Sequence, residues 1–184
     1  FALAAAARAQ GADVTLVAGP VALPTPAGVH RVDVRSAREM HAAVMACIDG
    51  QDLLIAAAAV ADYAPAHAST HKLKKDEASR SIELVRTTDI LAEVAARPQR
   101  PFLLGFAAET DDVEHYARGK LQAKGLDLIA ANRVGEPGSG FEADDNSIEL
   151  IWGDGARRFG PAPKTRLAQE LLAVVIEHME NRTR

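Results

Sequence analysis

Polar side chains stand at the ends of three apolar runs of the sequence, where a parallel sheet would bind a ligand. Asp62 follows the run LLIAAAAVA, Glu109 follows FLLGFAA, and Asn132 follows LDLIAA. The carboxyl ends of parallel strands share one edge, and α/β proteins bind their ligands there, so we expect the three side chains to lie together. Each of them could instead be an ordinary polar residue that leaves a core strand.

A lysine cluster begins ten residues beyond Asp62, in the polar stretch of residues 65–80. Its members are Lys72, Lys74 and Lys75. Ammonium groups clamp phosphates and offset the negative charge that develops during phosphoryl or nucleotidyl transfer. The stretch has little apolar content to anchor it, so we expect a mobile flap that carries these lysines. A solvated surface loop is the alternative interpretation.

A second pair of lysines, Lys120 and Lys124, is spaced four residues apart on a predicted helix. Residues four apart lie on the same face of a helix, where like charges repel each other unless an anion joins them. The spacing is therefore compatible with an anionic ligand, and an exposed polar face is again the alternative.

Several signatures of other chemistry are absent from the sequence. It contains no GxGxxG, GxxxxGK[ST] or GxSxG motif, and its six histidines are too scattered to predict a metal site. A single cysteine, Cys47, cannot form an internal disulfide, and we expect it to pack within a helix.

The composition is that of a folded globular protein. Of 184 residues, 48% are hydrophobic and 25% are charged, and the formal net charge is -4. This balance argues against disorder and against nucleic acid as a partner, because duplex binding needs a surplus of Lys and Arg. No apolar run reaches the roughly 18 residues that cross a bilayer. We therefore expect a cytoplasmic protein with no membrane partner.

Strand and helix patterns alternate along most of the chain. The sequence predicts strands over residues 14–17, 29–34, 52–61, 82–85, 102–106, 126–131, 147–152 and 157–159, and helices over residues 1–10, 37–48, 88–96, 112–124 and 164–179. We expect Ser36 to cap the second helix, and Gly11 and Gly125 to end the first and the fourth. The strand over residues 52–61 lacks polar alternation, so we expect it to be buried on both faces.

This order predicts an α/β fold in a single domain over residues 1–184. Strands that alternate with helices of this length form a Rossmann-like, doubly wound, mainly parallel sheet with helices on both faces. The last two strands, joined through Gly-Asp-Gly, predict an antiparallel β-hairpin near the C-terminus.

Taken in order, seven segments resemble phosphopantothenoylcysteine synthetase, a ligase family of coenzyme A biosynthesis. They are GADVTLVAGPVALPTP, AAAVADYAP, KLKK, TTDIL, LLGFAAET, ARGKLQAKGLDLIAAN and the acidic loop at residues 140–146. The resemblance covers essentially the whole chain. In most bacteria this family forms the C-terminal half of a bifunctional protein whose other half is a flavin-dependent decarboxylase, so no flavin is expected in this chain.

The resemblance implies a two-step ligation. The carboxylate of 4'-phosphopantothenate attacks the α-phosphate of CTP and releases pyrophosphate, and the amine of L-cysteine then attacks the acyl-cytidylate and releases CMP. It also implies Mg²⁺ as a cofactor and a homodimer as the assembly.

The resemblance also assigns residues to these substrates. The matched CTP-binding positions are Asp62, Lys72, Thr88, Asp89, Ile90, Leu91, Phe106, Lys120 and Lys124. Lys72 is the expected catalytic residue, which would close with the flap over the α-phosphate. Ala58 and Ala59 fall where the family's backbone meets the acyl substrate. An ionised Asp62 suits a ribose hydroxyl or a Mg²⁺ shell better than direct contact with phosphate.

One feature of the family has no counterpart in the sequence. Its asparagine, in a loop of the type NxSSGxxG that follows the first strand, would lie just before Phe1, so we expect residues 1–184 by themselves to be impaired as a ligase. Two other classes stay open: a nicotinamide- or flavin-dependent oxidoreductase on a Rossmann-like sheet, and a noncatalytic nucleotide-binding module.

Overall fold

The central feature of the molecule is a sheet of five strands in the order β3-β6-β7-β8-β9. A computed structural model describes residues 1–67, 69, 71, 79, 81–109, 112–133 and 145–182, and for Glu109 and Arg133 the backbone alone. The strands of this sheet are β3 (Leu53–Ala56), β6 (Phe102–Glu109), β7 (Leu128–Arg133), β8 (Asp145–Trp152) and β9 (Gly155–Pro163).

The central sheet combines parallel and antiparallel pairing. β3, β6 and β7 are parallel, and β8 and β9 continue the sheet as an antiparallel hairpin that turns at Gly153 and Asp154. A separate parallel pair is formed by β1 (Thr15–Ala18) and β2 (His30–Asp33). The predicted α/β class, with a mainly parallel sheet and a C-terminal hairpin, is confirmed.

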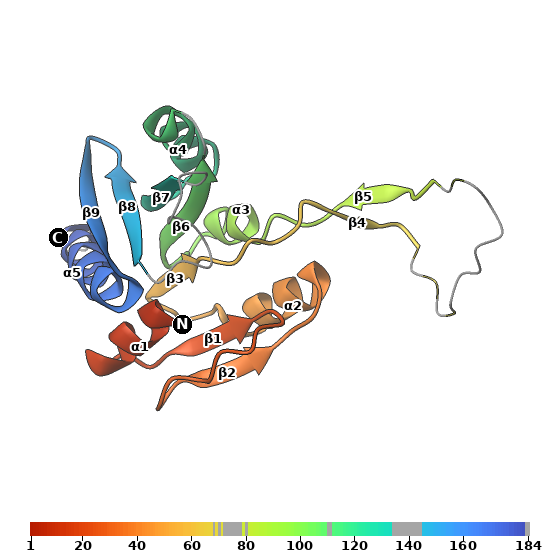
Figure 1. The fold of residues 1–184 in the computed structure, drawn as a ribbon, viewed down its shortest axis with the longest axis horizontal. Helices are drawn as coiled ribbons and strands as arrows, with labels where there is room; N and C mark the ends of the chain where they lie inside the picture. Colours follow the sequence, from red (N-terminus) through yellow and green to blue (C-terminus); the bar gives the residue numbers. More distant parts are fainter. Residues whose placement is uncertain are drawn as a thin grey trace.

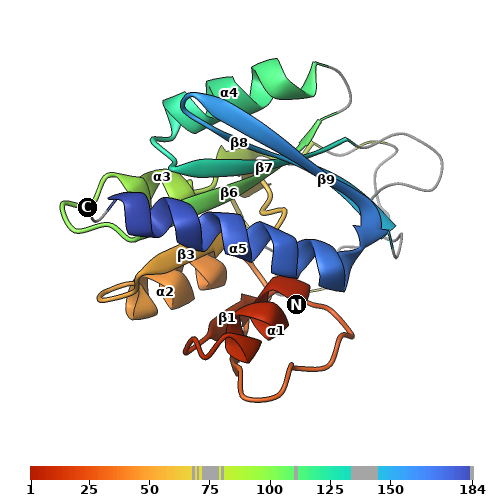
Figure 2. The same cartoon turned by 90° about the vertical axis from the view of Figure 1, so that its left-hand side faces the viewer.

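Helices cover both faces of the central sheet. They are α1 (Ala2–Ala9), α2 (Ala37–Cys47), α3 (Ile90–Ala95), α4 (Val113–Ala123) and α5 (Lys164–Arg182). In Figure 2, α4 and α5 lie on opposite sides of β6, β7 and β8, and α1 lies beside α5. We call the two sides the α4 face and the α5 face.

Alternating side chains of the parallel strands build a separate core on each face. On β7, Ile129 and Ala131 belong to the cluster on the α4 face, whereas Leu128 and Ala130 belong to the cluster on the α5 face. All four are at most 1% exposed. Burial on both faces explains why these strands read as continuous apolar runs in the sequence.

The predicted ends of three helices are confirmed by their capping geometry. The Ser36 hydroxyl accepts a hydrogen bond from the Glu39 N–H at 3.2 Å, and the Glu39 carboxylate accepts one from the Arg35 N–H at 2.8 Å. The first of these bonds satisfies an N–H group that the first turn of α2 leaves free, and the second ties Glu39 to the residue before the N-cap. Gly11 and Gly125 follow α1 and α4 with φ of 92° and 61°, which glycine adopts without a Cβ clash.

The predicted strand over residues 52–61 is wrong in its length and its burial. β3 ends at Ala56, its four residues are half-buried, and Ala57, Ala58 and Ala59 are exposed. The run is apolar because it is rich in alanine, and an exposed alanine costs little because its side chain is small. The uninterrupted run of apolar residues therefore does not form one long buried strand.

Beyond β3 the chain forms an arm that the sequence did not predict in full. β4 (Tyr63–Pro65) and β5 (Leu84–Arg86) pair antiparallel, and Figure 1 shows this ribbon projecting away from the rest of the molecule. The predicted strand over residues 82–85 is thus shifted to Leu84–Arg86. Ten residues of the expected flap, including Lys72, Lys74 and Lys75, lie outside the described residues.

Candidate functional site

The base of the arm brings together two chain segments that both carry predicted site residues. The Thr87 N–H donates to the carbonyl oxygen of Asp62 at 2.9 Å, and the Thr87 hydroxyl donates to the carbonyl oxygen of Ala61 at 2.6 Å. These bonds hold the Asp62 backbone next to Thr87, and Thr88 is the next residue in the chain. The Asp62 and Thr88 side chains are both exposed, so a ligand can reach them.

Asp89 links this base to the α4 face. Its carboxylate caps α3 by accepting a hydrogen bond from the Ala92 N–H at 3.0 Å, and it pairs with the Lys124 ammonium at 2.9 Å. Burial alone would raise the pKa of Asp89, but the hydrogen bonds from Lys124 and from the Ala92 N–H outweigh burial and lower it. Asp89 is therefore ionised at neutral pH.

The sequence placed the start of this helix too early. α3 begins at Ile90 rather than at Thr88, and the N–H of Ala92 is already bonded to Asp89. The first turn therefore offers fewer free N–H groups to a nucleotide than the sequence suggested. Fewer N–H groups are free because the aspartate at the N-cap accepts a hydrogen bond from a backbone N–H of the first turn.

Lys120 and Lys124 lie one turn apart at the end of α4. The Lys124 N–H donates to the Lys120 carbonyl oxygen at 3.0 Å, so their side chains leave the helix from neighbouring turns. The Asp89–Lys124 ion pair places the end of α4 beside the start of α3. The base of the arm precedes α3 in the chain. Contacts of neighbouring residues thus connect Asp62, Thr88, Asp89, Lys120 and Lys124, and we call this set of residues the α3–α4 site.

Gly105 of β6 allows α3 to approach the sheet closely. A Cβ at this position would meet the Leu91 Cδ2 at 3.3 Å and the Leu126 Cδ1 at 2.7 Å. Leu91 and Ile90 accordingly pack into the cluster on the α4 face. Phe106, the next residue of β6, points the other way and packs into the cluster on the α5 face. The Phe106 ring is therefore on the opposite side of the sheet from the two lysines.

Ala58 and Ala59 follow the carboxyl end of β3 and are both exposed. A run of small, exposed residues leaves backbone groups open to a ligand. In this run the Val60 N–H donates to the carbonyl oxygen of Ala58 at 3.1 Å, and the carbonyl oxygen of Ala61 accepts from the Thr87 hydroxyl. This position lies just before the base of the arm in the chain.

Asn132, at the carboxyl end of β7, differs from every other described polar side chain. It is 9% exposed, and its Oδ1 atom has no hydrogen-bond partner. The sequence marks Asn132 as a strand-end residue but assigns it to no ligand. The signal that the sequence does carry is its position: a polar side chain directly after the buried run LDLIAA.

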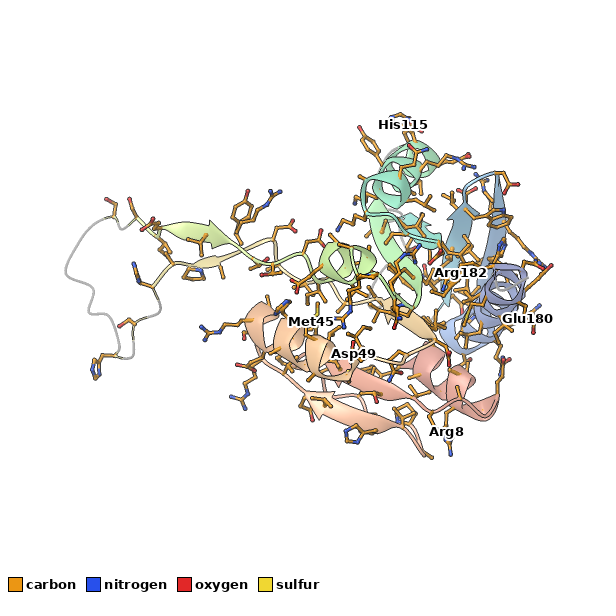
Figure 3. The ribbon with its side chains drawn as sticks, turned by 180° about the vertical axis from the view of Figure 1, so that it is seen from behind. Arg8, Met45, Asp49, His115, Glu180 and Arg182 are labelled. Atoms are coloured by element: carbon orange, nitrogen blue, oxygen red, sulfur yellow. The ribbon has the colours of Figure 1, made fainter. Side chains whose placement is uncertain are left out.

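Two predicted site features cannot be placed. Lys72 and the Glu109 side chain lie outside the described residues, so the structure does not place either beside Asp62 or Asn132. Among the described residues, no three His, Cys, Asp or Glu side chains are grouped so that they could hold a metal ion. His115, for example, lies on the outer side of α4 in Figure 3.

Two further observations concern a cavity away from these residues and the length of the helices. A cavity lined by residues 49–52 and 97–100 lies at the amino ends of β3 and β6 and contains none of the predicted site residues. In the part of the chain that is described, no helix is long and apolar enough to cross a membrane.

Curated relatives match this chain along nearly its whole length. It is 50% identical over 182 residues to the coenzyme A biosynthesis bifunctional protein CoaBC of Vibrio cholerae, an alignment that covers 97% of this chain and 46% of the relative. It is 47% identical to CoaBC of Escherichia coli over an alignment 188 residues long, which covers 100% of this chain and 46% of the relative. The chain thus spans about half the length of the curated relatives it matches.

Solved structures with the same fold include the C-terminal domain of a protein that bears the same name, CoaBC. The C-terminal domain of a CoaBC bifunctional protein superposes with a TM-score of 0.81 at 35% identity, over 98% of this chain and 81% of that chain. A DNA/pantothenate metabolism flavoprotein from Streptococcus pneumoniae, 19% identical, shares the fold over 96% of this chain and 86% of its own, with a TM-score of 0.79. Residues 1–179 match the sequence profile of one family, and the chain belongs to it: the C-terminal domain of the DNA/pantothenate metabolism flavoproteins.

Proposed function

We propose that the chain is the ligase domain of a coenzyme A biosynthesis protein, which joins 4'-phosphopantothenate to L-cysteine with CTP through an acyl-cytidylate. The observation that supports this proposal is the α3–α4 site: Thr87 bonds to the Asp62 backbone and Asp89 pairs with Lys124, so contacts link three separate segments that carry residues matched to CTP-binding positions. The names of the relatives support the same pathway. A Cab2 mutant in complex with phosphopantothenate-cysteine, 12% identical with a TM-score of 0.65, has the same fold.

In this proposal the triphosphate binds beside Lys120 and Lys124. A bound triphosphate would compete with Asp89 for the Lys124 ammonium and would relieve the repulsion between the two lysines. Lys72 would stabilise the charge that builds on the α-phosphate as pyrophosphate leaves. Mg²⁺ usually keeps several waters and binds through phosphates and one or two carboxylates. The exposed Asp62 suits such a shell, so the metal would arrive with the nucleotide.

Titration of purified full-length protein with CTP, ATP and NADPH separates this proposal from its competitors. A ligase of this kind should bind CTP most tightly, and only with Mg²⁺ at full affinity. Preference for NADPH would favour the oxidoreductase interpretation. Tight CTP binding with no pyrophosphate release when 4'-phosphopantothenate is also supplied would favour a noncatalytic nucleotide-binding module.

Replacing Lys124 or Lys120 by alanine should weaken CTP binding roughly tenfold in each variant, because a hydrogen bond to a charged group contributes about 1.5–3 kcal/mol. Calorimetry of CTP binding measures the effect. Asp89→Asn tests the competition for Lys124: asparagine also caps helices, so α3 and the Asp89 backbone keep their places while Lys124 loses its competing anion. CTP affinity in Asp89→Asn should therefore hold or rise. Unchanged affinity in both lysine variants would show that the triphosphate binds elsewhere.

We also propose that the protein forms a homodimer through the arm. The arm exposes Tyr63, Ile82, Leu84 and Val85, each at least 47% accessible. An isolated two-stranded ribbon is marginally stable in water and gains stability from further burial. A second copy of the same ribbon could cover these apolar side chains.

The variant Leu84→Lys should raise the dimer dissociation constant at least tenfold, because burying a leucine contributes roughly 1.5–3 kcal/mol and lysine reverses that gain. Analytical ultracentrifugation over a concentration series measures it. Leu23→Lys is the matched control, since Leu23 is 54% exposed and Leu84 is 55% exposed. If both variants associate like the wild type, the arm is not the dimer interface.

A further inference from the structure

Two ion pairs join α3 to α2, one in the first turn of α3 and one just beyond its last residue. The His41 Nε2 atom of α2 lies 2.9 Å from the Glu93 Oε2 atom of α3. Because a carboxylate only accepts hydrogen bonds, the imidazole N–H donates. After the end of α3, the Arg97 guanidinium pairs with the Asp49 carboxylate, which follows α2. The paired residues are 52 and 48 positions apart in the sequence, so the tertiary fold brings them together.

The position of α3 depends on its neighbours, because the helix is short. It has six residues, fewer than the roughly 12–15 that an isolated helix needs in water. Figures 1 and 2 show it between α4 and α2. Val94 of α3 is fully buried in the cluster on the α4 face, together with Val44 and Ile48 of α2. Apolar burial has no preferred direction, whereas a hydrogen bond joins two particular atoms and weakens when its angle changes. The ion pairs therefore define how α3 is turned on this packing surface.

The first turn of α3 is also tied to α4, through Asp89. The Glu93 N–H donates to the Asp89 carbonyl oxygen at 3.0 Å, and the Asp89 carboxylate pairs with Lys124 at 2.9 Å. Contacts thus run from His41 on α2, through one turn of α3, to Lys124 on α4. The positions matched to CTP binding include Asp89 and Lys124, but neither His41 nor Glu93.

We infer that His41 and Glu93 are positioning residues, whose hydrogen bond holds the first turn of α3 in place for the nucleotide. This inference rests on the ligase function proposed above, in which a triphosphate takes the Lys124 ammonium away from Asp89. Once that contact is broken, the His41–Glu93 bond still ties the first turn to a neighbouring helix.

The bond should matter more in the nucleotide-bound protein than in the free protein. A contact changes the affinity for a ligand only through the difference between its contributions to the free and bound states. In the free protein, Asp89–Lys124 and His41–Glu93 both hold the first turn. In the bound protein the first of these pairs is lost, so the second contributes more. The His41–Glu93 bond should therefore raise the affinity for CTP.

The test compares Glu93→Ala, His41→Ala and the variant with both changes, by calorimetry of CTP binding to the full-length protein with Mg²⁺. Alanine favours helix, so α2 and α3 should keep their structure. The two side chains are 28% and 47% exposed, and losing an ion pair of this kind should weaken CTP binding about three- to fivefold in each single variant. The double variant should lose no more than either single variant, because all three remove the same contact.

Glu93→Gln is the conservative variant that should rescue binding. Its amide oxygen still accepts a hydrogen bond from the imidazole N–H, so CTP affinity should stay within about twofold of the wild type. A role in stability alone would change the melting temperatures of the alanine variants and leave their CTP affinities equal to that of the wild type.

Asp49→Ala is the matched control, because it removes the other ion pair between the same two segments. That pair lies beyond the last turn of α3, and Arg97 keeps a contact with α2 through the Met45 Sδ atom at 3.9 Å. CTP affinity in Asp49→Ala should therefore stay within about twofold of the wild type, whatever happens to its melting temperature.

Four results would overturn the inference: wild-type CTP affinity in both single alanine variants, losses that add up in the double variant, an equal loss in Asp49→Ala, or a Glu93→Gln protein that binds CTP as weakly as Glu93→Ala. A wild-type protein that does not bind CTP would instead defeat the proposed function.

Discussion

Replacing Lys72 by alanine should lower kcat roughly 100- to 1000-fold while CTP affinity falls by less than about tenfold. The expected asymmetry comes from the timing of the contact. In the proposed reaction, negative charge would build on the α-phosphate as the acyl carboxylate attacks, so a nearby ammonium would bind the transition state more strongly than the ground state. Steady-state kinetics of the full-length protein, combined with calorimetry of CTP binding, separate the two quantities.

Lys75→Ala provides the matched control for Lys72, because both lysines belong to the KLKK motif of the same polar stretch. A general effect of lost positive charge would appear in both variants. A specific effect should leave Lys75→Ala within about threefold of the wild type, as for a solvated surface lysine. Equal losses of turnover and CTP affinity in Lys72→Ala would make Lys72 a binding residue without a catalytic role.

Asp127→Asn should destabilise the protein by roughly 3 kcal/mol, the second large effect that we expect. The Asp127 carboxylate accepts hydrogen bonds from the Leu103 N–H at 2.7 Å and from Arg100 Nη2 at 3.1 Å. Arg182 of α5, labelled in Figure 3, approaches it at 3.2 Å. The side chain is 13% exposed, so its loss would leave two guanidinium groups without their anion.

The same cluster predicts how stability depends on pH. Burial alone would raise the pKa of Asp127, but the hydrogen bonds from Arg100 and the Leu103 N–H outweigh it and hold the pKa below its ordinary value of 3.8. Because the folded-state pKa is lowered, this stabilisation is present above the unfolded-state pKa. It is lost as pH falls through that value toward the folded-state pKa.

Urea denaturation at pH 7 and over a series down to about pH 3 measures both effects. The wild type should lose stability below about pH 4 more steeply than Asp127→Asn. Asp13→Asn is the control, since Asp13 is fully exposed and pairs with Arg8 at 3.5 Å. Such a surface pair contributes about 0–1 kcal/mol. A similar loss in both variants would show that Asp127 contributes no more than an ordinary surface charge.

Periodicity and end signals in the sequence were sufficient for most of the fold. Ser36 marked the start of α2, Gly125 marked the end of α4, and the sequence Gly-Asp-Gly marked the hairpin. Each of these signals acts through bonds within a few residues, so the sequence around it determines the outcome.

The features that the sequence did not reveal depend on distant contacts. The Ala-rich run after β3 looked like a buried strand because its apolar character is visible in sequence while its packing partners are not. Asp89 was expected to lie in the candidate site, but its pairing with Lys124 depends on how α3 and α4 pack. That close approach depends in turn on the absence of a side chain at Gly105.

Asn132 illustrates the same limit for function. Its type and its position at a strand end were visible in the sequence, yet an amide there could equally bond to its own backbone. The unpartnered oxygen became visible only when the neighbouring strands were in place.

In the function that we propose, this domain forms an amide bond between 4'-phosphopantothenate and cysteine by cytidylyl transfer. The most direct measurement is the product balance when full-length protein is supplied with both substrates, CTP and Mg²⁺. We predict pyrophosphate and CMP in equal amounts, each matched by one 4'-phosphopantothenoylcysteine. Release of CDP and inorganic phosphate, or an absence of CMP while CTP is bound, would contradict the claim.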